Sequence, residues 1–219
     1  MPYAVASDDV KLYYEEAGEG TPILFIHEFA DDLRTWEHQF NHFSRNYRCI
    51  AYNARGYPPS DVPENSSSYS QLRAAEDARD VLKHLGIEKA HIIGLSMGGM
   101  IGQTAALKGQ GRFLSLSLCD TMSRVPPEMH SAWDERIANA RSEGMDALVE
   151  GTMARWFSED YMAAEPDECD KVRDMIRNTK VLGFCGCCRA IQGLDLTDRI
   201  SAITVPTQMI VGEDDPGTP

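Results

Sequence analysis

The chain has 219 residues, 42% of them hydrophobic, a length and composition that suit one large globular domain with a substantial core. Its 34 Asp and Glu residues outnumber its 21 Lys and Arg residues, and the formal net charge of −13 disfavours nucleic acid or an anionic lipid surface as a partner. The N-terminal residues lack the basic start and apolar block of a secretory signal, and no run is long enough for a membrane span, so we expect a cytoplasmic protein.

Apolar strand patterns alternate with amphipathic helix patterns along the first half of the chain. Residues 22–27, P-I-L-F-I-H, are apolar on both faces and predict a strand that is covered by helices. An aromatic stripe at helical spacing follows, formed by Trp36, Phe40 and Phe43, which we expect in the core. A second strand is predicted over residues 47–53.

A loop rich in Pro, Gly and Ser separates this strand from the next helix. Ser68 and Gln71 match a capping box for that helix, which is predicted to end at Gly86. Residues 91–96, H-I-I-G-L-S, predict a buried strand, a helix rich in small residues follows, and residues 113–120 predict another strand. Strands that alternate with helices predict a mostly parallel sheet with helices on both faces.

The pattern changes after the first half of the chain. Residues 124–192 are charged, amphipathic and helical without an intervening strand, so we predict an inserted helical cap there. The predicted core comprises residues 1–123 and 193–219, with a further strand in T-V-P-T-Q-M-I-V-G.

Large apolar side chains occur at helical spacing in the predicted cap. Trp133, Trp156 and Phe157, together with several methionines, indicate an adaptable apolar pocket. The same spacing equally fits residues that only pack the cap on the core.

The six cysteines do not form a pattern typical of a structural zinc site. Only Cys185 to Cys188, C-G-C-C, contains a cluster, and no second cysteine or histidine pair accompanies it. We therefore expect reduced, buried thiols and neither a metal nor a cofactor.

Residues 94–98, G-L-S-M-G, match the G-x-S-x-G pattern of a nucleophile elbow. They lie between an apolar strand and a glycine-rich helix, the sharp turn that holds a serine in strained geometry with its hydroxyl exposed. Gly94 and Gly98 are expected where neighbouring backbone leaves no room for a Cβ atom. The alternative is that Ser96 only caps a helix.

A serine nucleophile needs a base for its proton and fixed donors for the oxyanion that forms. The Met97 backbone N–H follows the nucleophile at the start of a helix, where the helix dipole also favours negative charge. The second donor is expected in the loop after the strand at 22–27, and by position we assign it to the Phe29 backbone N–H.

The chain resembles the α/β-hydrolase superfamily, in the cap-containing branch that includes enol-lactone hydrolases and haloperoxidase-like esterases. The resemblance spans nearly the whole chain and implies the α/β-hydrolase fold. It rests on four motifs: I-H-E-F, which ends at Phe29, N-A-R-G-Y-P-P-S (53–60), G-L-S-M-G-G (94–99) and V-P-T-Q-M-I-V-G-E-D-D-P-G-T-P (205–219).

Two positions depart from the family pattern. The family usually has His-Gly at the oxyanion loop, where this chain has His27-Glu28, and a side chain there strains or alters the loop. Asn53 stands where many relatives carry Asp, a change that we expect to be structural.

The resemblance implies that a G-x-x-D motif after the seventh strand supplies the acid of the catalytic triad, which assigns this role to Asp215. The adjacent Asp214 and the earlier Asp120 are alternatives. In relatives the catalytic histidine follows the acid, and none of the six histidines here matches that position; only His27 lies near the nucleophile. We therefore expect a C-terminally truncated chain without the catalytic histidine, the last strand and the final helix.

The sequence predicts a serine hydrolase of small carboxylic esters or lactones, which acts through an acyl-enzyme on Ser96 and is inactive or weak as this chain. The alternatives are a catalytically inactive fragment or ligand-binding scaffold, and a perhydrolase or haloperoxidase-like activity. The strand near the C-terminus is expected at a sheet edge, where its apolar residues favour self-association.

Overall fold

The computed structural model describes residues 1–215, 217 and 218; Pro216 and Pro219, which belong to the last sequence motif, lie outside the described residues. Within these residues seven strands form one sheet in the order β1-β2-β4-β3-β5-β6-β7. The strands are β1 (Tyr3–Val5), β2 (Lys11–Ala17), β3 (Pro22–Ile26), β4 (Arg48–Tyr52), β5 (Ala90–Leu95), β6 (Phe113–Cys119) and β7 (Thr207–Ile210). The β1–β2 and β2–β4 pairs are antiparallel, and the other four pairs, β4–β3, β3–β5, β5–β6 and β6–β7, are parallel. The mostly parallel sheet predicted from the sequence is therefore confirmed.

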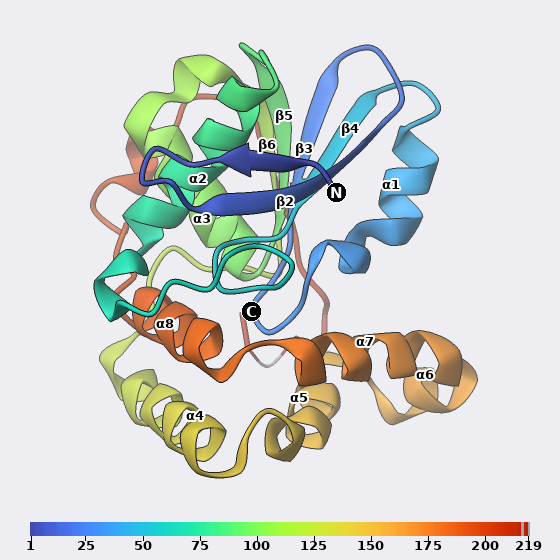
Figure 1. Ribbon diagram of the computed structural model, residues 1–219, viewed down its shortest axis with the longest axis vertical. Helices are drawn as coiled ribbons and strands as arrows, with labels where there is room; N and C mark the ends of the chain where they lie inside the picture. Colours follow the sequence, from blue (N-terminus) through green and yellow to red (C-terminus); the bar gives the residue numbers. More distant parts are fainter. Residues whose placement is uncertain (216, 219) are drawn as a thin grey trace.

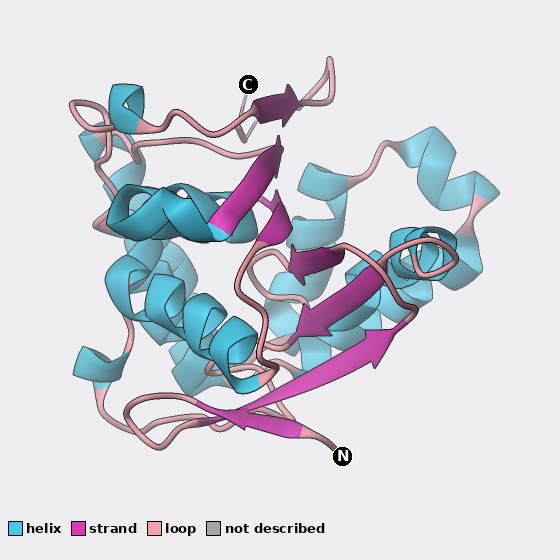
Figure 2. Cartoon of the chain, turned by 90° about the horizontal axis from the view of Figure 1, so that it is seen from above, coloured by secondary structure: helices cyan, strands magenta, loops and turns pink. Residues whose placement is uncertain are grey.

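Helices cover both faces of the sheet (Figure 1, Figure 2). They are α1 (Glu37–Phe43), α2 (Gln71–His84), α3 (Met97–Gly109), α4 (His130–Glu143), α5 (Val149–Trp156), α6 (Glu159–Ala164), α7 (Pro166–Asn178) and α8 (Val181–Gln192). Successive side chains of a strand point to opposite faces. Along β3, Phe25 therefore joins a core cluster with Trp36 and the aromatic residues of α1, whereas Leu24 and Ile26 join the larger cluster that includes α2 and α3.

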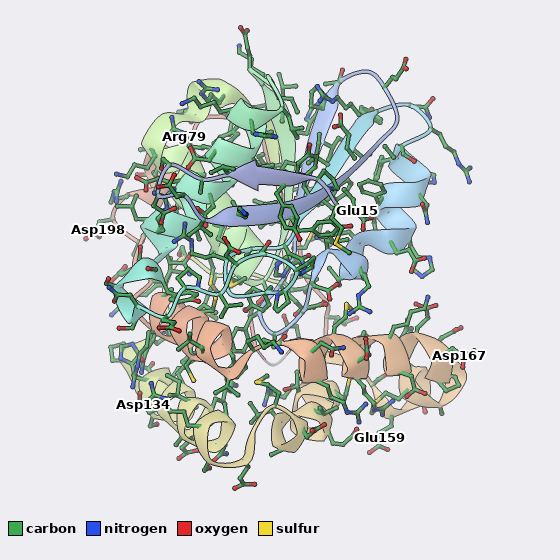
Figure 3. The ribbon with its side chains drawn as sticks, viewed as in Figure 1. Glu15, Arg79, Asp134, Glu159, Asp167 and Asp198 are labelled. Atoms are coloured by element: carbon green, nitrogen blue, oxygen red, sulfur yellow. The ribbon has the colours of Figure 1, made fainter. Side chains whose placement is uncertain are left out.

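Helices α4 to α8 lie between β6 and β7 in the sequence, inside the segment predicted to form the cap. Figure 1 shows them side by side below the sheet. Asp134, Glu159 and Asp167 lie on the outer side of this layer (Figure 3). Helix α8 approaches the loop after β4 so closely that a Cβ atom on Gly183 would be 2.1 Å from the Gly56 carbonyl oxygen. The exact division into core and cap remains a prediction.

Helix α2 begins later than the capping box predicted. Its N-cap is Ser70, whose hydroxyl accepts the Arg73 backbone N–H at 3.0 Å. Ser68 instead ends a short 3₁₀ turn that Asn65 caps. The expected cap was therefore wrong by two residues, because a second serine in the same run takes the extended conformation that an N-cap needs.

A buried ion pair connects α2 to the loop after β4. The Arg55 guanidinium contacts both carboxylate oxygens of Asp77, at 2.6 and 2.7 Å, and both side chains are only 2% exposed. Its Nη1 and Nη2 also donate to the Asp8 carboxylate, at 2.9 and 3.0 Å, in the turn between β1 and β2. Three segments that are distant in sequence are therefore held together beside the sheet.

Among the helices of the described residues, none combines the length and the apolar character required to cross a bilayer.

Candidate active site

Ser96 occupies a sharp turn between the end of β5 and the start of α3. Its backbone has φ 49° and ψ −109°, a conformation that a non-glycine residue adopts only at a cost. A Cβ atom on Gly94 would be 2.4 Å from the Gly98 backbone, and one on Gly98 would be 2.2 Å from the Ile26 carbonyl oxygen. Within the described residues the Ser96 hydroxyl makes no capping hydrogen bond, so a role as a mere helix cap gains no support.

A hollow of about 330 Å³ lies between the carboxyl ends of the parallel strands and the helices α4 and α5. This size suits a small molecule. The residues that line it include five that follow the ends of four strands: Glu28, Phe29, Ser96, Asp120 and Asp215. The structure therefore brings the predicted nucleophile, the predicted acid and the Phe29 loop to one cavity.

The two predicted oxyanion donors have no acceptor within the described residues. No hydrogen bond from the Phe29 or the Met97 backbone N–H occurs there. The Met97 side chain is buried and lines a separate crevice, not the hollow. The Phe29 ring lines the hollow and packs on Phe184 of α8, with ring centroids 4.6 Å apart.

The three candidate acids differ in their surroundings. Asp215 lines the hollow, and its carboxylate accepts the Gly217 backbone N–H at 2.7 Å and the Thr218 hydroxyl. Burial works against ionisation, but these hydrogen bonds hold the pKa of Asp215 below its ordinary value. Asp120 also lines the hollow and accepts the Gly212 backbone N–H at 2.9 Å. Asp214 lines only a second cavity of about 670 Å³, which adjoins the hollow and shares Asp120 and Asp215 with it.

No histidine is among the residues that line the hollow in the described part of the chain. His27 is completely buried, and both ring nitrogens are engaged: Nδ1 donates to the Glu28 carbonyl at 2.6 Å, and Nε2 accepts the Ala54 backbone N–H at 2.9 Å. Burial lowers the pKa of His27 to about 4. These contacts tie the loop after β3 to the loop after β4 and leave no free nitrogen for a proton transfer.

Asn53 lies beside this junction and is buried. Its side-chain oxygen accepts the Leu33 backbone N–H at 2.9 Å, and its amide donates to the Pro58 carbonyl at 2.7 Å. These contacts are structural, as expected for this departure from the family pattern.

The roof of the hollow is aromatic and cationic. Trp133 and Trp156 line it, and two arginines that sequence reasoning missed, Arg136 of α4 and Arg155 of α5, line it as well. Arg136 lies 4.4 Å from the centre of the Trp133 ring, and Arg155 contacts Thr152 at 3.1 Å. Partial burial and the nearby Arg136 charge lower the pKa of Arg155 to about 10, although the residue keeps an exposed surface.

The position of Arg136 three residues after Trp133 is a local signal for one shared helix face. No local signal indicates that this face turns toward Ser96. That arrangement depends on how the inserted helices pack.

All six cysteines are free thiols, and those of α8 are buried. Burial raises the pKa of Cys187 to about 12. Within residues 1–215, 217 and 218, no group of three or more His, Cys, Asp or Glu side chains has an arrangement that could hold a metal ion.

The sequence pattern of the alpha/beta hydrolase fold family matches residues 21–219. A 3-oxoadipate enol-lactonase of Acinetobacter baylyi is 30% identical over 196 residues, which cover 90% of this chain and 72% of the relative. An enol-lactonase from Burkholderia xenovorans LB400 superposes with a TM-score of 0.93 at 32% identity, covering 99% of this chain and 83% of that one. A thermophilic esterase from Thermogutta terrifontis also gives a TM-score of 0.93, at 28% identity, with 100% and 82% of the two chains covered.

Proposed function

The chain belongs to the alpha/beta hydrolase fold family, and from this premise we propose that it is a serine hydrolase of carboxylic esters or lactones. The observation that carries the proposal is the strained turn at Ser96, which opens into the hollow that Phe29 and Asp215 also line. The enol-lactonases and the esterase among its relatives support small lactones or esters as substrates.

The proposed reaction has two steps. The Ser96 oxygen attacks the acyl carbon while a base takes the hydroxyl proton, and the alcohol leaves with that proton. The Phe29 and Met97 N–H groups, which have no acceptor within the described residues, bind the oxyanion. Water then hydrolyses the acyl-enzyme by the same route in reverse. Asp215 orients the base and stabilises its protonated form.

We propose that the base is a histidine other than the six in the printed sequence. The support is that no histidine lines the hollow within the described residues, and that His27 engages both of its ring nitrogens. Loss of the base from a triad removes most of the rate acceleration, so the chain by itself is expected to turn over slowly.

The test is ester hydrolysis in the presence of added imidazole, which can stand in for a missing base. After subtraction of the protein-free rate at each imidazole concentration, we expect slow release of p-nitrophenol from p-nitrophenyl acetate, a clear acceleration by imidazole, and loss of both in Ser96→Ala. Ser201→Ala, which removes an exposed serine that is not among the residues lining the hollow, is the matched control. If Ser96→Ala and the wild type respond equally to imidazole, the proposed nucleophile is wrong.

Two other outcomes distinguish the alternatives. A ligand-binding scaffold binds small esters without imidazole-dependent turnover by Ser96. A perhydrolase uses hydrogen peroxide in place of water in the second step, so peracid forms from an ester and peroxide.

We also propose that β7 pairs with a second copy of the chain. In the described residues β7 lies at the edge of the sheet, and Met209, Ile210 and Val211 are 67%, 48% and 52% exposed. An apolar edge with unpaired backbone groups is a template for another strand.

The free thiols support our proposal of a reducing, cytosolic location.

A further inference from the structure

The layer formed by helices α4 to α8 contacts the rest of the chain in two different ways. On the α8 side the contact is close packing. A Cβ atom on Gly183 would be 2.1 Å from the Gly56 carbonyl oxygen, and the Phe184 ring lies 4.6 Å from the Phe29 ring, centre to centre. Such packing leaves no room for α8 to move without loss of contacts, so this side of the layer is fixed.

On the α7 side the contacts are charged and exposed. They join α7 to α1 and to η1, the 3₁₀ turn Leu33–Trp36 that precedes α1 (Figure 1). Three contacts cross this boundary: Arg34 Nη1 to Asp174 Oδ2 at 3.0 Å, Lys171 Nζ to Glu37 Oε2 at 3.4 Å, and His38 Nε2 to Glu168 Oε2 at 3.4 Å. We call these six residues the latch.

The charges of the latch are arranged in a fixed order. Its residues on α7 are spaced three apart, so they share one face of the helix. Along that face a positive Lys171 stands between the negative Glu168 and Asp174, opposite a negative Glu37 and a positive Arg34. A shift of α7 along η1 and α1 would bring like charges together, so the pattern allows one closed position.

Apolar packing joins α7 to α5 and not to the segment beneath it. Leu33 and Trp36 of η1 belong to the smaller core cluster, which contains no residue of α7 within the described part of the chain. Cys169 and Ile176 of α7 belong to the larger cluster, together with Met153 of α5. Helices α5 and α7 are therefore expected to move as one body.

A movement of this body would uncover the proposed active site. Arg155 and Trp156 at the end of α5 line the hollow with Ser96, and they also line the second cavity. Thr35, the residue after Arg34 of the latch, lines the second cavity from the opposite side. The latch therefore begins next to the cavity that adjoins the hollow.

We propose that the latch is a reversible closure of the hollow. When its contacts break, α5 and α7 lift together from η1 and α1 and admit a substrate; when they form, Trp156 covers the substrate above Ser96. Exposed ion pairs contribute little to stability and are screened by salt, so contacts of this kind break and re-form readily. The role in substrate entry rests on the proposed function, whereas the movement itself does not.

Distances between two spin labels test the movement without any catalysis. Asn41→Cys and Asp167→Cys place the labels at exposed positions of α1 and α7, and each single variant shows what the native thiols contribute. We expect one distance at about 0.05 M sodium chloride and a second, longer distance at about 1 M, where salt screens the latch.

Charge changes in the doubly labelled chain identify the cause. Lys171→Glu should populate the longer distance at low salt, and the charge exchange Glu37→Lys with Lys171→Glu should restore the shorter one. Lys180→Glu makes the same charge change at an exposed lysine outside the latch and should have no effect. Distances that ignore salt and Lys171→Glu, an equal response to Lys180→Glu, or an exchange that restores nothing would overturn the proposal.

The role in substrate entry has its own readout, the rate at which Ser96 is labelled with imidazole present. A bulky fluorophosphonate that carries rhodamine should label Lys171→Glu about threefold faster than the wild type, whereas compact diisopropyl fluorophosphate should gain little. Equal gains with both probes, or none with the bulky one, would refute the role. If neither probe labels the wild type, the proposed function fails, whereas the spin-label distances still decide the movement.

Discussion

Gly98 shows how closely the turn at Ser96 is packed. Its Cα faces the end of β3, where a Cβ atom would be 2.2 Å from the Ile26 carbonyl oxygen. We predict that Gly98→Ala destabilises the protein by about 3 kcal/mol or more, because backbone on both sides must move. Chemical denaturation monitored by circular dichroism measures this change.

Gly111→Ala is the matched control, since a Cβ atom there has nothing within 4 Å. It should leave the unfolding midpoint almost unchanged. Equal effects of the two substitutions would show that the close approach of β3 and α3 does not limit the residue at 98.

The burial of His27 should make the stability of the fold sensitive to acid. Burial lowers its pKa to about 4 in the folded chain, whereas an unfolded histidine titrates near 6.5. As the pH falls below about 6.5, the histidine is protonated in the unfolded state but not in the folded state. The free energy of unfolding therefore falls, by up to about 3 kcal/mol at about pH 4.

Urea unfolding between about pH 4.5 and pH 7.5 measures this dependence. His27→Gln should be less stable at neutral pH but should lose less stability on acidification. A variant with the wild-type pH slope would mean that His27 is not the group responsible.

The turn at Ser96 was predictable from sequence because its requirements are local. Two glycines, a preceding apolar strand and a following helix suffice to specify it. The surroundings of Glu28 were not predictable, because burial in the folded chain and the charges of Asp120 and Asp215, which come from distant strands, raise its pKa.

At the scale of elements, the Arg55–Asp77 pair joins α2 to the loop after β4. Removal of one partner leaves a buried charge without compensation, so we predict that Arg55→Met costs about 3–5 kcal/mol of stability. Arg73, which lies 3.3 Å from Asp77, compensates only in part because it also contacts Asp80. Thermal or urea unfolding gives the change.

Arg173→Met is the comparison, because Arg173 contacts the largely exposed Glu150 on the surface. It should have little effect on stability. If both arginine variants unfold at the same midpoint, the buried pair does not hold these elements together.

The order and type of the main elements followed from periodicity, whereas some of their ends did not. Ser68 has the stronger sequence signal, because Gln71 completes a capping box with it, but the backbone conformation selects Ser70 as the N-cap. The cationic roof of the hollow was missed for a related reason. Arg136 and Arg155 look like solvated surface charges until the packing of α4 and α5 places them over Ser96.

At the scale of the whole molecule, the exposed edge at β7 predicts self-association. Sedimentation velocity over a concentration series should show a reversible shift toward dimers. Met209→Lys should weaken the association by about tenfold, which corresponds to about 1.4 kcal/mol from lost apolar contact and added charge.

Leu72→Lys makes the same change at another exposed apolar residue, 41% accessible on α2, and should leave the association unchanged. A wild-type chain that is monomeric at every concentration would contradict the proposed edge pairing. Equal weakening by both variants would place the contact elsewhere.

The central claim is that Ser96, at the strained turn, is the nucleophile that attacks a substrate bound in the hollow. Peptide mapping by mass spectrometry after incubation with a fluorophosphonate, with imidazole present, tests it most directly. We predict one covalent adduct, located on Ser96 and absent from Ser96→Ala. An adduct on another residue, or an unmodified Ser96 in a folded chain with imidazole present, would contradict the account.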